Sequence, residues 1–187
     1  MNSNGIHLVL GGSRSGKSER AEQLVKQSNL PVTYMATCRR DPAVDEEMRE
    51  RIQKHQSRRP AEWELVENRF DLAEILKERP DRIVLMDCLT LWIAERLGQL
   101  DSVQGVLDEL NAALEGKPAS TRLVIVSNEV GSGIVPCTAS TRRFRDLSGW
   151  ANQAAARHAE QVDWITAGLW VPLKREGKAC HLDMAAI

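Results

Sequence analysis

The sequence lacks any hydrophobic run long enough to cross a membrane, since none approaches the roughly 20 apolar residues that a spanning helix needs. Its first residues, MNSNG, also lack the basic segment and the apolar segment of a secretory signal peptide. We therefore expect a cytoplasmic protein without a membrane span.

An excess of either charge is missing as well. Lys and Arg together number 25 against 26 Asp and Glu, which gives a formal net charge of -1 at pH 7. Such a balance provides no overall field that attracts nucleic acid or an anionic membrane. We expect no nucleic-acid partner, and any bound anion must be held by a local site.

Closely spaced cysteines are also absent. The four cysteines, Cys38, Cys88, Cys137 and Cys180, lie far apart, and no C-x-x-C pair occurs. This spacing argues against a zinc cage and against a disulfide framework, and it fits a reducing cytoplasm.

Short apolar runs alternate with helical patterns along most of the 187 residues. The expected strands are 6–10, 32–36, 82–87, 122–127 and 162–167. The expected helices are 17–28, 45–57, 71–78, 89–98, 102–115 and approximately 140–161. Within the last of these helices, Phe144, Leu147 and Ala151 share one face and are expected to pack on the sheet.

Unbroken apolar strands separated by helices are typical of a parallel sheet that is covered on both faces. The fold class is therefore an α/β three-layer sandwich with a mainly parallel sheet. The length allows one core, so we expect a single domain over 1–187. Residues 175–187 show no interpretable pattern and are a possible tail.

The segment GGSRSGKS, residues 11–18, fits the phosphate-loop pattern G-x-x-x-x-G-K-[ST] between an expected strand and an expected helix. Its glycines let backbone N–H groups point toward an anion, and the amino end of the helix adds partial positive charge. Lys17 is expected to neutralise the β- and γ-phosphates, and the Ser18 hydroxyl to bind Mg²⁺. With this loop, the expected fold is of the P-loop NTPase-like (RecA-like) kind, and 1–187 is expected to be a single P-loop nucleotide-binding domain. The alternative is a glycine-rich turn.

Asp87 ends the apolar run IVLMD and is the expected second ligand for Mg²⁺. The alternative interpretation is a helix cap, because a helix pattern begins at Leu89. Cys88 follows, where motor-type ATPases carry a catalytic glutamate, and this disfavours a water-activating ATPase.

His55 lies among Lys54, Arg58 and Arg59. Neighbouring cations disfavour the protonated imidazole, so we expect a neutral ring with a free lone pair that is able to attack phosphorus. The same cations suit the phosphates of a nucleotide. A solvated or capping histidine on a basic surface is the alternative.

Four ordered motifs resemble one family, the bifunctional adenosylcobinamide kinase / adenosylcobinamide-phosphate guanylyltransferases of cobalamin biosynthesis. They are GGSRSGKSERAE; YMAT with DEEMRERIQKHQSRRPAEW and Glu67; DCLTLW; and SNEVGSGIVP with RRFRDLSGWANQ. The resemblance extends to about Lys174.

The resemblance implies two reactions at one nucleotide site. The γ-phosphate of ATP or GTP passes to adenosylcobinamide, and GMP from GTP is then attached to give adenosylcobinamide-GDP. In that family the second reaction passes through a guanylyl-histidine, and His55 stands at the matching position. The resemblance also implies a homotrimer.

The catalytic residues are then His55 and Lys17. The implied nucleotide-binding residues are Gly11, Gly12, Ser13, Arg14, Ser15, Gly16, Lys17, Ser18, Thr37, Cys38, Arg39, Gln56, Ser57, Arg58, Arg59, Glu67 and Asp87. As a hypothesis, Glu67 accepts hydrogen bonds from guanine and sets the choice of base.

The chain departs from the family after Pro136, where CTAST replaces an expected acidic or amide-containing stretch, and in residues 175–187, which extend past the usual end. Two other functions remain open. A GTP-binding switch would need an N-K-x-D motif, which is absent, and a simple small-molecule kinase would not need His55.

Overall fold

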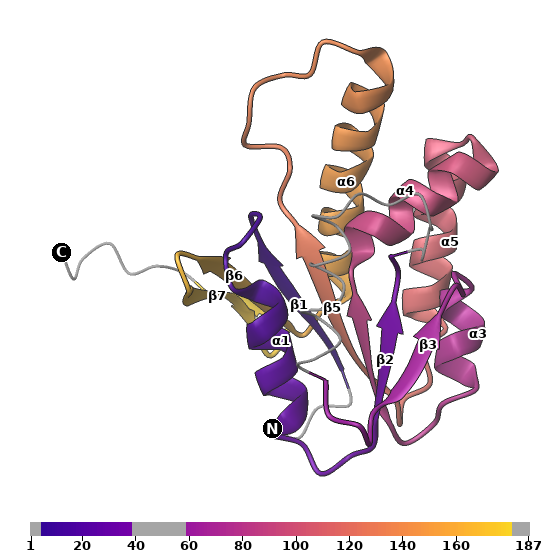
Figure 1. Cartoon of the computed structure of the whole chain (residues 1–187), viewed down its shortest axis with the longest axis vertical. Coiled ribbons are helices and arrows are strands. Elements are labelled where there is room, and N and C mark those ends of the chain that lie inside the picture. The colour runs from indigo at the N-terminus through magenta and orange to yellow at the C-terminus, as the bar shows by residue number, and fades with distance from the viewer. Residues whose placement is uncertain (1–4, 39–58, 181–187) are drawn as a thin grey trace, which may run out of the picture.

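The computed structural model describes residues 5–38 and 59–180. An eight-stranded sheet forms its centre, with the strand order β3-β2-β4-β5-β1-β6-β7-β8 (Figure 1). The strands are β1 (Ile6–Gly11), β2 (Val32–Ala36), β3 (Glu64–Glu67), β4 (Ile83–Asp87), β5 (Arg122–Asn128), β6 (Gln161–Thr166), β7 (Leu169–Arg175) and β8 (Lys178–Ala179). The helices are α1 (Lys17–Lys26), α3 (Leu72–Lys77), α4 (Leu89–Leu100), α5 (Val103–Glu115) and α6 (Ala139–His158).

All pairs from β3 to β6 are parallel, whereas β7 pairs antiparallel with β6 and β8 pairs antiparallel with β7. The five strands expected from the sequence are confirmed with small shifts at their ends. Three strands were not expected: β3, β7 and β8. The last two show that part of the stretch after 174 belongs to the sheet. The expected helix 45–57 lies outside the described residues.

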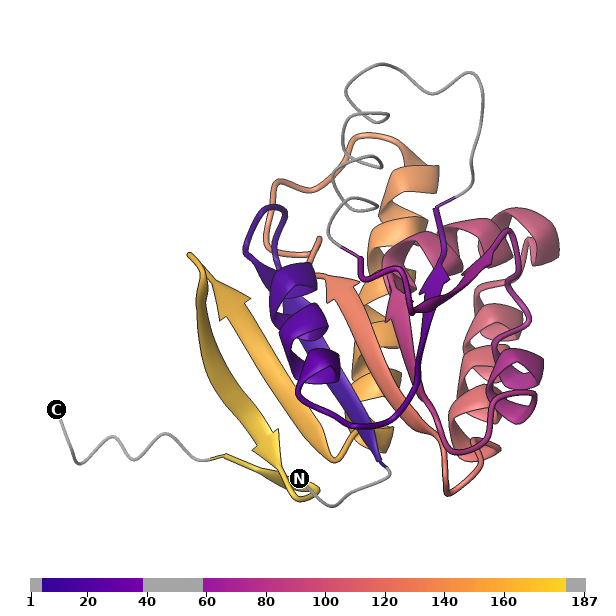
Figure 2. The ribbon, with the colours of Figure 1, turned by 60° about the horizontal axis from the view of Figure 1, so that its bottom comes forward.

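Helices cover both faces of the sheet, as Figures 1 and 2 show. On one face α1 packs against apolar side chains of β1, β2, β4, β5 and β6, including Val9, Leu85 and Val126. On the other face α3, α4, α5 and α6 enclose the larger core, with the fully buried Trp92 near its centre. The α/β three-layer sandwich predicted from the sequence is confirmed.

The packing of α6 also follows the prediction. Leu147 and Ala151 are fully buried in the larger core, and Phe144 packs against it. A β-strand alternates its side chains between two faces, so the two apolar cores fix which side of the sheet every strand residue faces. None of the helices in the described ranges has the length and apolar character to span a bilayer.

Candidate nucleotide site

The phosphate loop connects β1 to α1, as the sequence predicts. Gly11 is required by close packing, because a Cβ there would lie 2.5 Å from the backbone oxygen of Ile165. Gly16 adopts a φ of 97° just before the helix, a conformation that favours glycine. These two positions let the backbone N–H groups at the start of α1 gather around an anion.

Lys17 is the first residue of α1, and its ammonium group folds back over the loop. Its Nζ donates to the carbonyl oxygen of Gly12 at 3.0 Å. The side chain is mostly buried, with 9% of its surface exposed. The positive charge is therefore held at the mouth of the loop, where the β- and γ-phosphates of a nucleotide would lie.

The turn between β6 and β7 is hydrogen-bonded to the phosphate loop. The N–H of Gly168 donates to the carbonyl oxygen of Ser15 at 3.0 Å. The hairpin is tied to α1 as well, since the Arg20 guanidinium carbon lies 4.5 Å from the ring centre of Trp170 and Arg20 pairs with the buried Asp163. Sequence reasoning missed this support because it comes from β7.

Asp87 ends β4 and accepts a hydrogen bond from the hydroxyl of Tyr34, with 2.7 Å between the oxygens. Burial raises the pKa of Tyr34 well above its usual range, and the Asp87 carboxylate raises it further. The phenol therefore remains a donor and orients the carboxylate. Cys88, rather than Asp87, holds the N-cap position of α4.

Thr37 ties the end of β2 to the end of β4. Its hydroxyl donates to the carbonyl oxygen of Cys88 at 2.7 Å and accepts from the N–H of Cys88 at 2.6 Å, while its own N–H donates to the carbonyl oxygen of Asp87. Thr37 is 2% exposed. Its hydroxyl ties the strand ends together, and the nucleotide contact that the resemblance implies stays a prediction.

The cysteines near Asp87 are thiols rather than thiolates. Burial raises the pKa of Cys88 to about 11, with Asp87 adding to the rise and Lys17 opposing it. Burial and Asp87 also raise the pKa of the partly exposed Cys38. Neither thiol is therefore suited to act as a nucleophile near neutral pH.

Arg59 is the first described residue after the gap at 39–58. Its guanidinium carbon lies 3.6 Å from the ring centre of Tyr34, so the cation stacks on the residue that orients Asp87. Within the described residues, its Nε and one terminal nitrogen are buried without a hydrogen-bond partner. The Arg59 guanidinium therefore places a positive charge beside the Asp87 end of the site.

Glu67 ends β3, two strands away from Asp87 in the sheet order and opposite Ala36 in register. Val66 packs in the larger core, so Glu67 faces the α1 side of the sheet. Four strand spacings separate β3 from β1, which corresponds to about 19 Å. Glu67 therefore lies at the far end of the carboxyl edge from the phosphate loop.

The structure thus brings part of the predicted set to one edge of the sheet. The phosphate loop begins at the last residue of β1 and consists of Gly11, Gly12, Ser13, Arg14, Ser15, Gly16, Lys17 and Ser18. Thr37, Cys38, Glu67 and Asp87 lie at or just after the last residues of β2, β3 and β4, and Arg59 joins them through its contact with Tyr34. Parallel strands bring their carboxyl ends together, where ligands bind in open α/β sheets. Five predicted residues, Arg39, His55, Gln56, Ser57 and Arg58, lie outside the described residues.

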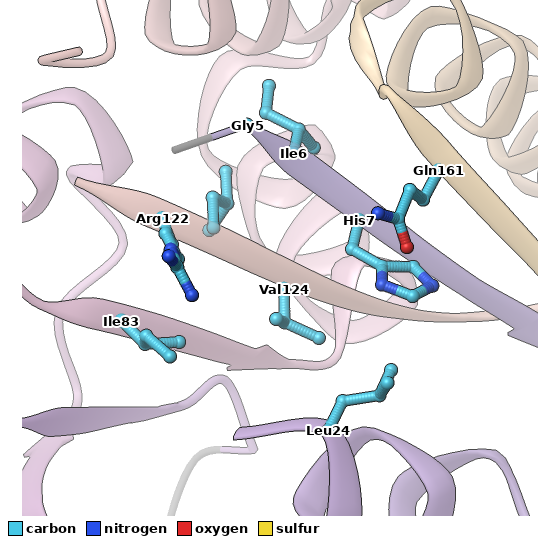
Figure 3. Close-up of a pocket in the computed structure, with 9 residues that line it drawn as sticks. Gly5, Ile6, His7, Leu24, Ile83, Arg122, Val124 and Gln161 are labelled. Carbon is cyan, nitrogen blue, oxygen red and sulfur yellow. The ribbon is translucent and has the colours of Figure 1, made fainter. Parts of the chain in front are cut away.

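A small cavity of about 60 Å³, whose lining residues Figure 3 shows, lies at the amino ends of the strands. Ile6, Ile83 and Arg122, which line it, are the first residues of β1, β4 and β5. Since the phosphate loop follows the last residue of β1, this cavity is separate from the candidate site.

Known proteins were compared with the chain. The family described as cobinamide kinase / cobinamide phosphate guanyltransferase matches residues 7–173. The chain belongs to this family. Its members carry out both reactions, so the chain is a member of a family of bifunctional kinase and guanylyltransferase enzymes.

Two similar relatives have curated names. The bifunctional adenosylcobalamin biosynthesis protein CobP of Pseudomonas aeruginosa is 43% identical over 176 residues, covering 90% of this chain and 97% of the relative. The protein CobU of Escherichia coli, with the same description, is 36% identical over 184 residues, covering 89% and 98%. The family resemblance seen in the sequence is confirmed.

Solved structures share the fold at low identity. An ATPase of a bacterial type III secretion system aligns with a TM-score of 0.58 and 13% identity, over 88% of this chain and 51% of that chain. A protein of Pyrococcus horikoshii aligns with a TM-score of 0.56 and 11% identity, over 98% and 95%. The P-loop NTPase-like fold class is thereby confirmed.

Proposed function

We propose that this protein phosphorylates adenosylcobinamide with ATP or GTP and then transfers GMP from GTP to adenosylcobinamide phosphate, which gives adenosylcobinamide-GDP. The observation that carries the proposal is the family match over residues 7–173 on a fold that places a complete phosphate loop and Asp87 at one edge of the sheet. Adenosylcobinamide and its phosphate are the proposed partners, and the resemblance adds a homotrimer in the cytoplasm.

In the kinase step, the loop at 11–18 binds the triphosphate and Lys17 neutralises charge on the β- and γ-phosphates. Ser18 and Asp87 would hold Mg²⁺, which fits a partly exposed hydroxyl at the start of α1 and a carboxylate oriented by Tyr34. When bound there, the metal would supply positive charge that stabilises the phosphoryl group during transfer. Tyr34 and Arg59 keep Asp87 in place for this role.

In the guanylyl step, a ring nitrogen of His55 attacks the α-phosphorus of GTP. The bond between the α-phosphorus and the bridging oxygen breaks, and pyrophosphate leaves with the electron pair. A phosphate oxygen of adenosylcobinamide phosphate then attacks the same phosphorus and releases the imidazole. The covalent intermediate splits one transfer into two displacements, so pyrophosphate departs before the bulky acceptor reacts.

The position of Arg59 supports a role for His55. Arg59 follows His55 by four positions in the sequence. Arg59 stacks on Tyr34, which bonds Asp87. Arg59 thus joins the Asp87 end of the site, and it belongs to the same basic stretch of the sequence as His55.

The function is tested by supplying the purified protein with adenosylcobinamide and ATP, and then with adenosylcobinamide phosphate and GTP, each with Mg²⁺. We expect adenosylcobinamide phosphate from the first reaction and adenosylcobinamide-GDP from the second, both identified by mass spectrometry. A phosphorylated product without the second product would show a kinase alone, and hydrolysis of GTP without either product would favour a switch.

Guanine selection by Glu67 is a separate proposal. A carboxylate accepts hydrogen bonds from N1–H and the 2-amino group of guanine, which adenine cannot offer. We expect Glu67→Gln to reduce the preference for GTP over ATP in the guanylyl step by about 10- to 100-fold, because an amide presents one acceptor and one donor. The measurement compares kcat/KM for the two nucleotides.

Glu62→Gln is a suitable control, since Glu62 is an exposed glutamate before β3. An unchanged preference for GTP in Glu67→Gln would show that the base is read elsewhere. The distance of Glu67 from β1 makes this test informative, because the nucleotide would have to lie across the ends of several strands.

A further inference from the structure

Asn128 occupies the central position of the carboxyl edge, although sequence reasoning gave it no role of its own. It is the last residue of β5, the strand between β1 and β4 in the sheet. In register it lies opposite Gly11, the first residue of the phosphate loop, whereas Asp87 lies opposite Val126. Asn128 therefore extends two residues beyond Asp87 toward the edge where a nucleotide would bind.

The side chain of Asn128 lies on the same face as Lys17 and Asp87. Val124 and Val126 pack in the core beneath α1, and alternation along β5 places Asn128 on that face. Its amide nitrogen lies 3.9 Å from the sulfur of Cys88, the residue after Asp87. Asn128 thus lies on the strand between β1, which leads to Lys17, and β4, which ends at Asp87.

Two buried polar side chains hold the backbone of Asn128, and a third holds one of these two. Its N–H donates to the Thr90 hydroxyl at 2.8 Å, and its carbonyl oxygen accepts from the Asn152 amide at 3.2 Å. Asn152 also accepts from the Ser127 hydroxyl at 2.6 Å. These side chains, Thr90, Ser127 and Asn152, are 6%, 2% and 7% exposed.

Burying a polar network costs free energy of folding unless every polar group is hydrogen-bonded. Apolar residues would fill the same space without that requirement. The arrangement comes from α4, β5 and α6, and its bonds converge on one residue. Its effect is to fix the backbone of Asn128, while the side-chain amide donates to the sulfur of Cys88. A fixed neutral donor is what stabilises charge that develops during a reaction, since no reorganisation is then needed.

We propose that Asn128 is a catalytic residue of the kinase reaction, with its side-chain amide donating a hydrogen bond to an oxygen of the γ-phosphoryl group. This inference rests on the proposed function. In the reaction, the acceptor hydroxyl oxygen bonds to the γ-phosphorus, and the bond to the β–γ bridging oxygen breaks. The nucleoside diphosphate leaves with the electron pair, and the hydroxyl proton passes to solvent.

The residue type suits this position. A neutral amide adds a donor between Lys17 and Asp87 without competing with the carboxylate for a cation. It acts on the γ-phosphoryl group, where the charge changes during kinase transfer. In guanylyl transfer the reacting phosphorus is the α-phosphorus, so the amide contacts only the departing pyrophosphate. The two reactions of the protein should therefore respond differently to its loss.

The test compares Asn128→Ala and the equally sized Asn128→Asp with the wild-type protein. We expect kcat for phosphorylation of adenosylcobinamide to fall about 100- to 1,000-fold in both variants, while KM for ATP changes less than about 3-fold. Formation of the enzyme–GMP adduct should fall no more than about 10-fold. Asn111→Ala, a partly exposed asparagine of α5 that bonds His158, is the control and should match wild type.

A second measurement does not depend on turnover. With a non-hydrolysable ATP analogue bound, the ³¹P resonance of the γ-phosphate should differ between wild type and both Asn128 variants, while the α-phosphate resonance stays the same. The inference is overturned if kcat stays within about 3-fold of wild type, or if both reactions fall equally without a change in the γ resonance. If wild type makes no adenosylcobinamide phosphate, the proposed function fails, and the resonance alone decides the role of Asn128.

Discussion

Replacing His55 with alanine is expected to abolish the covalent label that the protein acquires from α-³²P-GTP. The imidazole is the proposed nucleophile, and an alanine side chain has no lone pair to replace it. In the wild-type protein the label should survive denaturing electrophoresis, resist alkali and be lost in acid, as a phosphoramidate is. In His55→Ala we expect less than about 1% of the wild-type label, since nucleophile loss costs several orders of magnitude in rate.

His158→Ala is the matched control. This histidine lies at the end of α6, contacts Asn111 through its ring and is partly exposed, so its replacement should leave the label intact. Kinase activity of His55→Ala should remain within about 10-fold of wild type, because phosphoryl transfer has no covalent histidine step. Full labelling of His55→Ala would show that another residue is the nucleophile.

Lys17→Ala is expected to impair both reactions, because both use the same triphosphate. Its ammonium group is held over the phosphate loop by the bond to the carbonyl oxygen of Gly12. Removing a charge that stabilises a phosphoryl transition state lowers kcat about 100- to 1,000-fold. We also expect weaker binding of ATP and GTP, measured by calorimetry.

Lys26→Ala is a suitable comparison, since Lys26 lies in the last turn of the same helix and contacts Trp63. It should retain wild-type affinity and rate. If Lys17→Ala bound nucleotide as well as wild type and retained either activity, the loop would not hold the triphosphate in the proposed manner.

Much of the fold could be predicted because its strands are continuous apolar runs. Parallel strands covered on both faces carry Val, Ile and Leu without alternation, as in β4 and β5. The strand β3 was missed because it is four residues long and begins and ends with glutamate. The strand β7 was missed because it lies near an edge, contains Pro172 and exposes much of its surface.

The phosphate loop could be predicted for a different reason, namely that its conformation depends on local residues such as Gly11 and Gly16. The roles of Tyr34, Asn128 and Gly168 depend instead on which strands are neighbours, and strand order is not encoded in any single segment. In the sequence alone, Tyr34 is indistinguishable from the other buried residues of its strand, because nothing in that segment shows that β4 lies beside β2. Its contact with Asp87 then becomes visible.

That contact has a practical consequence, because Tyr34 is the single tyrosine of the chain. Isotopic labelling of tyrosine would place one spectroscopic reporter in the whole protein, and this reporter is hydrogen-bonded to Asp87 and stacked by Arg59. Its signal needs no assignment by mutation. Binding of nucleotide at the site can therefore be followed in solution during turnover through the signal of this one natural residue.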